Sequence, residues 1–373
     1  MHLALPTVVA RAVVGALLVG CALLPPFDAA ARHVLMRWDV VHFLHVARRG
    51  YVFEHDWAWL PALPALLALS PVAPTLLSLA VACDATDTMY RLSLHHLASP
   101  ALARLAAVLS LLPSSPATLF WAPYTEPFFT YLSYKGMLYC ATAHYLPAAL
   151  AFTLAAAFRS NGFLLSGFIV WSMLVQPFLQ HAHPRIDAWP APRTVLACVV
   201  LSAMPLTPFV AHNYAAYRAF CNTVYTPAPW CVRPLPLVYS YVQGRYWDVG
   251  LFRYWSLQQL PNFLIAAPPL LAITAFSVHH LRHCLKFPAP PPRTFLAPSI
   301  APHAIHALLM SGILLFASHT QVILRQAAAM PITYWAAAWL LLEHPKWGRA
   351  WVAWSILWGA LSVLLWGVFL PPA

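Results

Sequence analysis

The sequence predicts an all-α polytopic membrane protein, with residues 1–373 forming a single membrane domain. Three observations lead to this prediction. The chain is 61% hydrophobic and 8% charged, with a mean hydropathy of +0.67, whereas soluble globular domains are about 25% charged. Apolar stretches near the ~18–20 residues that cross a bilayer recur along the whole length. The polar residues are concentrated in two long segments between those stretches.

The apolar stretches predict roughly eleven transmembrane helices. They lie at about 7–24, 57–82, 97–112, 116–138, 141–158, 162–180, 194–212, 261–283, 302–318, 326–343 and 350–369. The first could instead be a cleaved signal peptide, but Arg11 interrupts it and no basic segment precedes it. Four prolines between positions 61 and 74 predict a kinked second helix beside a water-filled cavity.

The two polar segments, about 25–56 and 213–260, are expected on the same side of the membrane, because an even number of predicted helices separates them. The first segment is unusually rich in charge for this chain. Asp39, Glu54 and Asp56 lie in it with several arginines and histidines, and Asp28 lies just upstream. We expect this segment to lie in water at the membrane surface.

Within the first segment, residues from Met36 to Arg49 predict an amphipathic helix at the interface, which Gly50 ends. Its apolar stripe would be Val40, Phe43, Leu44 and Ala47. Asp39 and His42 are three residues apart and therefore share a face. Such a pair can be acid–base machinery or a structural hydrogen bond, and spacing alone does not decide between them.

The formal charge of +11 does not indicate a nucleic-acid partner. The basic residues are dispersed among apolar stretches and form no continuous stripe that could follow a phosphate backbone. The phosphate of a lipid or lipid-linked sugar is the better anionic partner. Arg253 and Arg325, at the predicted membrane edge, are either ligands for such a phosphate or ordinary interfacial anchors.

The seven cysteines are scattered and form no CxxC pairs, so we expect no sulfur-ligated metal site. Cys221 and Cys231 flank a polar loop that contains proline. A disulfide there would imply an oxidising compartment, and two unpaired thiols are the alternative.

Glu126 lies in an apolar stretch, where a carboxylate is costly and marks a functional candidate. The structural alternative is a buried partner for Arg104, Lys135 or a backbone group.

A series of short motifs occurs between about residues 37 and 335. They are Trp38-Asp39, His42-Phe43-Leu44, Glu54-His55, Pro123-Tyr124, Glu126, Arg159-Ser160-Asn161-Gly162, Pro229-Trp230-Cys231, Arg253-Tyr254 and Leu324-Arg325. In this order they resemble the GPI mannosyltransferase II family. The motifs up to His55 resemble its first luminal loop. Pro123-Tyr124 and Glu126 resemble its APYSE-type segment, the run from Arg159 to Gly162 resembles its RSNG segment, and Leu324-Arg325 resembles its late segment.

The resemblance implies a GT-C type glycosyltransferase, a multi-pass protein of the endoplasmic reticulum membrane. It would transfer the second mannose, α-1,6-linked, from dolichol-phosphate mannose to the glycolipid precursor of GPI on the luminal side. No other cofactor and no metal is implied. The resemblance leaves room for a small accessory membrane subunit.

The resemblance also assigns residues. Asp39 matches the acidic residue that activates the acceptor hydroxyl, with His42 beside it. Because the donor is β-linked and the product α-linked, a single displacement with inversion is implied. Such a reaction needs a base for the acceptor proton and positive charge for the leaving phosphate. The residues expected to bind donor or acceptor are Trp38, Glu54, His55, Glu126, Arg159, Arg253 and Arg325.

Other classes of protein remain open from composition alone. Another polyprenyl-phosphate-sugar transferase would differ only in its acceptor. A secondary transporter would also have many spans, although such proteins usually carry internal repeats, and none is visible here. A non-catalytic assembly factor would not need a carboxylate at Asp39.

Overall fold

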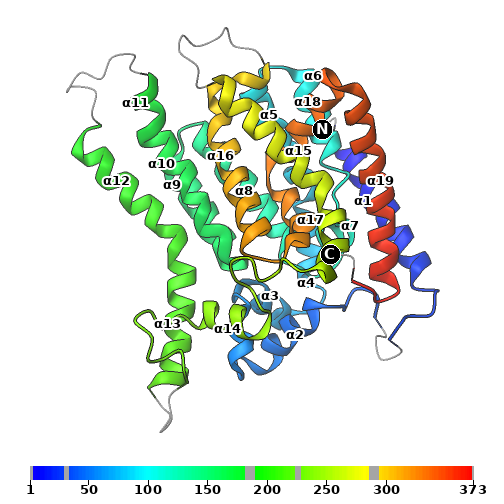
Figure 1. Cartoon of the computed structure of the whole chain (residues 1–373), viewed down its shortest axis with the longest axis vertical. Helices are drawn as coiled ribbons and strands as arrows, with labels where there is room; N and C mark the ends of the chain where they lie inside the picture. The colour runs from blue at the N-terminus through cyan, green and yellow to red at the C-terminus, as the bar shows by residue number, and fades with distance from the viewer. Residues whose placement is uncertain (1–2, 29–32, 181–189, 223–227, 285–293, 372–373) are drawn as a thin grey trace.

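The computed structural model describes residues 3–28, 33–180, 190–222, 228–284 and 294–371. Every regular element in these ranges is a helix, which confirms the all-α prediction (Figure 1). The α-helices are α1 (Ala4–Cys21), α2 (Asp39–Arg49), α3 (Ala62–Leu69), α4 (Ala73–Ala80), α5 (Ala82–Leu97), α6 (Pro100–Leu109), α7 (Pro116–Phe120), α8 (Glu126–Ala141), α9 (Tyr145–Phe158), α10 (Ser166–Val170), α11 (Gln176–Gln180), α12 (Pro192–Ala203), α13 (Thr207–Cys221), α14 (Val238–Tyr246), α15 (Leu260–Cys284), α16 (Ala301–Phe316), α17 (Ile323–Gln326), α18 (Pro331–Glu343) and α19 (Pro345–Gly367).

Six helical stretches in the described ranges are long and apolar enough to cross a membrane, so the chain is a multi-pass membrane protein. They are Ala4–Cys21, Ser160–Leu179, Pro192–Cys221, Leu257–Cys284, Pro298–Phe316 and Pro345–Gly367. A seventh results if α3 and α4, which are bent by 108° at their junction, form one span. The expected number of roughly eleven is not confirmed.

The difference arises because several of the predicted stretches form helices that are shorter than a membrane span. The stretch at 97–112 forms only α6, and that at 141–158 forms only α9, both short for a membrane span. Helix α18 is buried from Pro331 to Trp339 inside the bundle. The stretch at 57–82 does contain a break at its prolines, as expected, but the bend is too sharp for a simple kink.

The two polar segments pack against each other at one end of the molecule, the lower end in Figure 1, where α2 and α14 lie. Trp230 is fully buried there and donates a hydrogen bond from Nε1 to Glu54 Oε1 at 2.9 Å. The imidazole of His212 bonds the carbonyl of Trp57 at 3.0 Å. Cys221 forms a disulfide with Cys231, which lies in the same cluster.

Helix α2 begins at Asp39 and not at the expected Met36. Trp38 has a φ of 53°, in the left-handed region, and cannot continue a right-handed helix. Gly50 ends the helix as predicted, with a φ of 75°. Of the predicted stripe, Val40 and Phe43 are buried, whereas Leu44 and Ala47 are half-buried.

The charge of this segment does not all lie in water. Asp56 is 1% exposed and accepts backbone N–H bonds from Val52 at 3.0 Å and Phe53 at 2.7 Å. Arg37 is 3% exposed, and its guanidinium lies 5.2 Å from the ring of Phe369. These two residues stabilise the fold of the segment, and this corrects the expectation of a fully hydrated loop.

Close packing fixes the segment that follows α9. A Cβ on Gly162 would lie 2.5 Å from the backbone Cα of Ala156, so only glycine fits there. The turn Ser160–Leu165 therefore folds back tightly against α9. This fold-back fixes the direction in which Arg159, the residue between them, leaves the helix.

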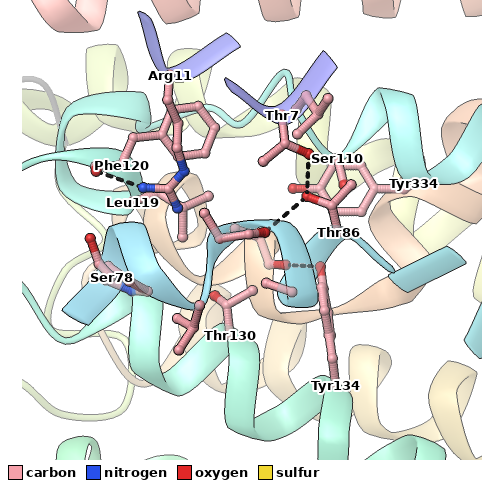
Figure 2. Close-up of a pocket in the computed structure, with 16 residues that line it drawn as sticks. Thr7, Arg11, Ser78, Thr86, Ser110, Leu119, Phe120, Thr130, Tyr134 and Tyr334 are labelled. Atoms are coloured by element: carbon pink, nitrogen blue, oxygen red, sulfur yellow. Dashed lines mark hydrogen bonds between the residues drawn. The ribbon is translucent and has the colours of Figure 1, made fainter. Parts of the chain in front are cut away.

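Helix α1 is anchored in the bundle by hydrogen bonds beside a small cavity of about 40 Å³ (Figure 2). Arg11, near the middle of this candidate span, donates from Nη1 to the carbonyl of Phe120 at 2.8 Å, and its own carbonyl accepts from Trp121 Nε1 at 2.9 Å. The hydroxyl of Thr7 donates to Thr86 of α5 at 3.0 Å. These hydrogen bonds satisfy the polar side chains of α1, for which the hydrocarbon of a bilayer offers no partners.

Candidate active site

A larger cavity, of about 270 Å³, opens where the two polar segments meet the bundle. It combines acidic, basic and aromatic side chains from segments far apart in the sequence. Its lining consists of Asp39, Phe43, Ala58, Trp59, Leu60, Tyr124, Thr125, Glu126, Phe158, Arg159, Ser160, Asn161, Tyr239, Gln243, Trp247, Val249, Ser318, His319, Val322 and Arg325.

Asp39 is held at the cavity by the start of helix α2. The backbone N–H of Asp39 donates to the hydroxyl of Tyr124 at 3.1 Å. Tyr124 is 2% exposed and packs edge-on against Phe43 and Trp366. The carboxylate is 29% exposed, so it is anchored by the helix and still accessible to a substrate.

Two arginines and two carboxylates form a continuous network along the cavity. Arg325 Nη1 donates to Asp39 Oδ2 at 2.8 Å, and Arg325 Nε lies 3.7 Å from Glu126 Oε1. Arg159 Nη1 donates to the same Glu126 oxygen at 2.7 Å and lies 3.2 Å from Thr125 Oγ1. The order of the chain of contacts is therefore Asp39, Arg325, Glu126, Arg159.

Burial makes each member of this network depend on its partners. The side chain of Glu126 is only 3% exposed, and those of Arg159 and Arg325 are 17% and 18% exposed. A lone charge in such a place would be strongly destabilising, whereas a paired and hydrogen-bonded charge is tolerated. Glu126 is thus paired with Arg159 and Arg325, and not with Arg104 or Lys135; Lys135 pairs instead with Asp84 at 2.8 Å.

Aromatic side chains form the part of the wall nearest the polar segments. Trp59 and Trp247 meet edge-to-face with ring centroids 5.9 Å apart, and Trp59 packs similarly on Phe43 at 5.0 Å. Tyr239 is fixed by a 2.6 Å hydrogen bond between its hydroxyl and that of Ser160. Flat apolar faces beside charged groups are suited to sugar rings, which present C–H faces and hydroxyl edges.

Five of the predicted site residues lie outside this cavity lining. Trp38 stacks on Phe369 at 5.0 Å, facing a separate surface hollow. Glu54 accepts the bond from Trp230, and His55 stacks on Phe53 at 5.5 Å. Arg253 is 54% exposed and pairs with Asp248 at 3.4 Å. His42, the fifth, lies behind Trp59.

His42 stacks on Trp59 with ring centroids 5.4 Å apart. Burial lowers the pKa of His42 from its ordinary value, although the nearby Asp39 acts in the opposite direction. The imidazole is therefore mostly neutral at pH 7 and supports the aromatic wall from behind.

The cavity also contains residues that the sequence analysis did not single out for function. Tyr239, Gln243, Trp247 and His319 line it, and His319 is fixed by a 2.8 Å bond to the carbonyl of Trp247. Tyr239 and Trp247 do lie in the second polar segment, in short runs that also match the family's order, and this match was the signal that could have marked them. Within the described ranges, no three His, Cys, Asp or Glu side chains are grouped as metal ligands would be.

Comparison with known proteins identifies the family. The family described as Mannosyltransferase (PIG-V) matches residues 28–373, which is most of the chain. The chain belongs to the PIG-V mannosyltransferase family. All four charged residues of the network fall within the matched range, and membership of the PIG-V family makes the protein a glycosyltransferase.

Similar PIG-V relatives include fungal and mammalian proteins. GPI mannosyltransferase 2 of Cryptococcus neoformans var. neoformans is 30% identical over 94% of this chain and 93% of its own length. GPI mannosyltransferase 2 of Aspergillus fumigatus is 33% identical over 91% and 81%. GPI alpha-1,6-mannosyltransferase 2 of Mus musculus is 32% identical over 83% and 73%. No solved structure matches the chain with significance.

Proposed function

We propose that this protein transfers the second mannose, in α-1,6 linkage, from dolichol-phosphate mannose to the glycolipid precursor of GPI. The main support is its similarity, over most of its length, to relatives named GPI mannosyltransferase 2 and GPI alpha-1,6-mannosyltransferase 2. The cavity supports the same activity, because it joins a partly exposed carboxylate to two arginines and an aromatic wall.

In the proposed reaction, Asp39 is the general base. The acceptor hydroxyl gives its proton to the Asp39 carboxylate while its oxygen bonds to the anomeric carbon of mannose. The bond from that carbon to the phosphate oxygen breaks, and its electron pair leaves with dolichyl phosphate. One displacement of this kind inverts the β-linked donor into an α-linked product. A positioned base contributes typically about 10²–10⁴-fold to the rate of such a transfer.

We further propose that the fold is of the GT-C type, set in the endoplasmic reticulum membrane, with the two polar segments on the luminal side. Their packing into one unit supports a common side, because segments joined through Trp230 and Glu54 cannot lie on opposite faces of a bilayer. The shorter helices α5, α6, α8, α9 and α18, added to the six long stretches, would then bring the membrane-embedded helices to roughly eleven. A small accessory subunit is compatible with this arrangement.

Lipid analysis of cells that lack the protein tests this proposal. A GPI intermediate with one mannose should accumulate, and expression of the wild-type chain should convert it. Microsomes with the wild-type chain should also transfer labelled mannose from dolichol-phosphate mannose to that intermediate. Accumulation of an intermediate with two mannoses, or with none, would assign the protein to a different step.

A further inference from the structure

We propose that Arg325 is a counter-ion shared in turn by Asp39 and by the leaving phosphate during mannose transfer. This inference rests on the proposed function and gives Arg325 a catalytic role within it. Before transfer the guanidinium pairs with the Asp39 carboxylate. As Asp39 takes up the acceptor proton, the same guanidinium becomes available to the phosphate that departs.

The position of Arg325 in the network is the first support. Its Nη1 bonds Asp39 at 2.8 Å, and its Nε lies 3.7 Å from Glu126. No hydrogen bond from the described residues engages its Nη2, although the side chain lines the cavity. A phosphate oxygen can therefore bond this third nitrogen without first displacing a carboxylate. Paired N–H groups of one guanidinium match the spacing of phosphate oxygens.

The charges of the reaction are the second support. Before transfer, the Asp39 carboxylate carries one negative charge and the phosphodiester of the sugar donor carries another. After transfer, protonated Asp39 is neutral, while dolichyl phosphate, as a monoester, has gained a second negative charge. One unit of negative charge has thus moved from Asp39 to the phosphate. A cation in contact with Asp39 that also faces the cavity stabilises both ends of this movement, and most strongly the phosphate end once Asp39 is neutral.

Arg159 provides the internal comparison. It lines the same cavity, but its Nη1 is bonded to Glu126, which takes no proton in the proposed reaction. The partner to which Arg159 is bonded therefore keeps its charge from bound donor to transition state. Interactions that are equal in both states affect KM, whereas interactions that strengthen in the transition state affect kcat. Substitution of Arg325 should therefore lower mainly kcat, whereas substitution of Arg159 should raise mainly the donor KM.

The test measures initial rates in microsomes that contain each variant as the sole source of activity, with dolichol-phosphate mannose varied. Protein amounts are taken from quantitative blots. Arg325→Gln should lower kcat by at least about 100-fold, as loss of a transition-state charge ligand does, with the donor KM changed less than about threefold. Arg159→Gln should instead raise the donor KM, with a smaller effect on kcat. Arg233→Gln is the matched control, because Arg233 is exposed, lies over the ring of Tyr241 and is outside the cavity lining.

Two results would overturn the inference. In the first, Arg325→Gln raises the donor KM with kcat unchanged, which makes Arg325 a ground-state ligand like Arg159. In the second, neither parameter changes. If Arg325→Gln fails to accumulate in the membrane, Arg325→Lys is measured in its place. Lysine keeps the charge but not the planar fork, so kcat should fall about tenfold with the donor KM unchanged, and a raised KM is again the contrary result. Absence of transfer by the wild-type chain would instead overturn the proposed function.

Discussion

Asp39→Asn separates the chemistry of the carboxylate from its role in the fold. Asparagine has the same shape, and its amide oxygen can still accept the bond from Arg325 Nη1 that Asp39 Oδ2 accepts at 2.8 Å. The bond from the Asp39 backbone N–H to Tyr124 is unaffected, because it does not involve the side chain. With the side chain 29% exposed, we expect a loss of about 0.5–1.5 kcal/mol of stability.

The effect on catalysis should be much larger. An amide cannot take the acceptor proton, so transfer should fall about 10²–10⁴-fold, which corresponds to about 2.7–5.4 kcal/mol of transition-state stabilisation. The assay is rescue of GPI-anchored surface proteins in cells that lack the chain, with the variant expressed at low level. Membrane abundance is measured in parallel by blot.

Asp248→Asn is the matched control for this experiment. Asp248 lies in the second polar segment, 77% exposed, and is paired only with Arg253 at 3.4 Å among the described residues. Its substitution should leave rescue intact. Near-normal rescue by Asp39→Asn at wild-type abundance would show that the base is another group. The presence of Asp39 in the cavity would then no longer support identifying the cavity as the active site.

Three further predictions concern the surroundings of the cavity. Tyr124→Phe removes the hydroxyl that accepts the Asp39 N–H. We expect about 1 kcal/mol of destabilisation and a lower kcat at unchanged donor KM. An unchanged kcat would contradict a role of Tyr124 in positioning Asp39. Gly162→Ala places a Cβ 2.5 Å from Ala156 Cα and should lower the free energy of unfolding by about 1–3 kcal/mol. The measurement is the Tm in detergent. Gly167→Ala is the control, because a Cβ there meets nothing within 4 Å. Glycosylation sequons inserted in 25–56 or 213–260 should be modified in cells; modification only near Pro290 would invert the proposed topology.

The sequence predicted the members of the charged network better than their partners. Asp39, Glu126, Arg159 and Arg325 were all candidates, and the structure brings all four to one cavity. The pairs could not be read from spacing, since Asp39 and Arg325 are 286 positions apart and meet only through the packing of the bundle. For the same reason the structural alternative for Glu126 named Arg104, Lys135 or a backbone group as its partner, whereas Arg159 holds it.

Other predicted site residues lie outside the cavity lining, because motif position does not reveal where a side chain points. Trp38 and Asp39 are adjacent, yet the left-handed backbone at Trp38 sends its ring to Phe369 while Asp39 begins a helix at the cavity. Arg253 resembles a phosphate ligand in sequence but pairs with Asp248 at the surface. Hydropathy likewise predicted roughly eleven membrane helices, of which six in the described ranges are long and apolar enough to span on their own.

Helix ends lower the cost of holding three of the four charges together. Asp39 and Glu126 are the first residues of α2 and α8, where helix dipoles favour negative charge. Arg159 directly follows α9, where positive charge is favoured. Arg325 lies in the single turn of α17 and depends on its two carboxylate partners. The pairs differ in their support, however. Glu126 and Arg159 are carried by α8 and α9, packed so closely that a Cβ on Gly136 would lie 2.2 Å from Phe152. Asp39 and Arg325 are carried by a helix in a polar segment and by a single four-residue turn between two 3₁₀ turns. The pair whose arginine is shared with the leaving phosphate in the proposed reaction is thus the one held by the smaller elements.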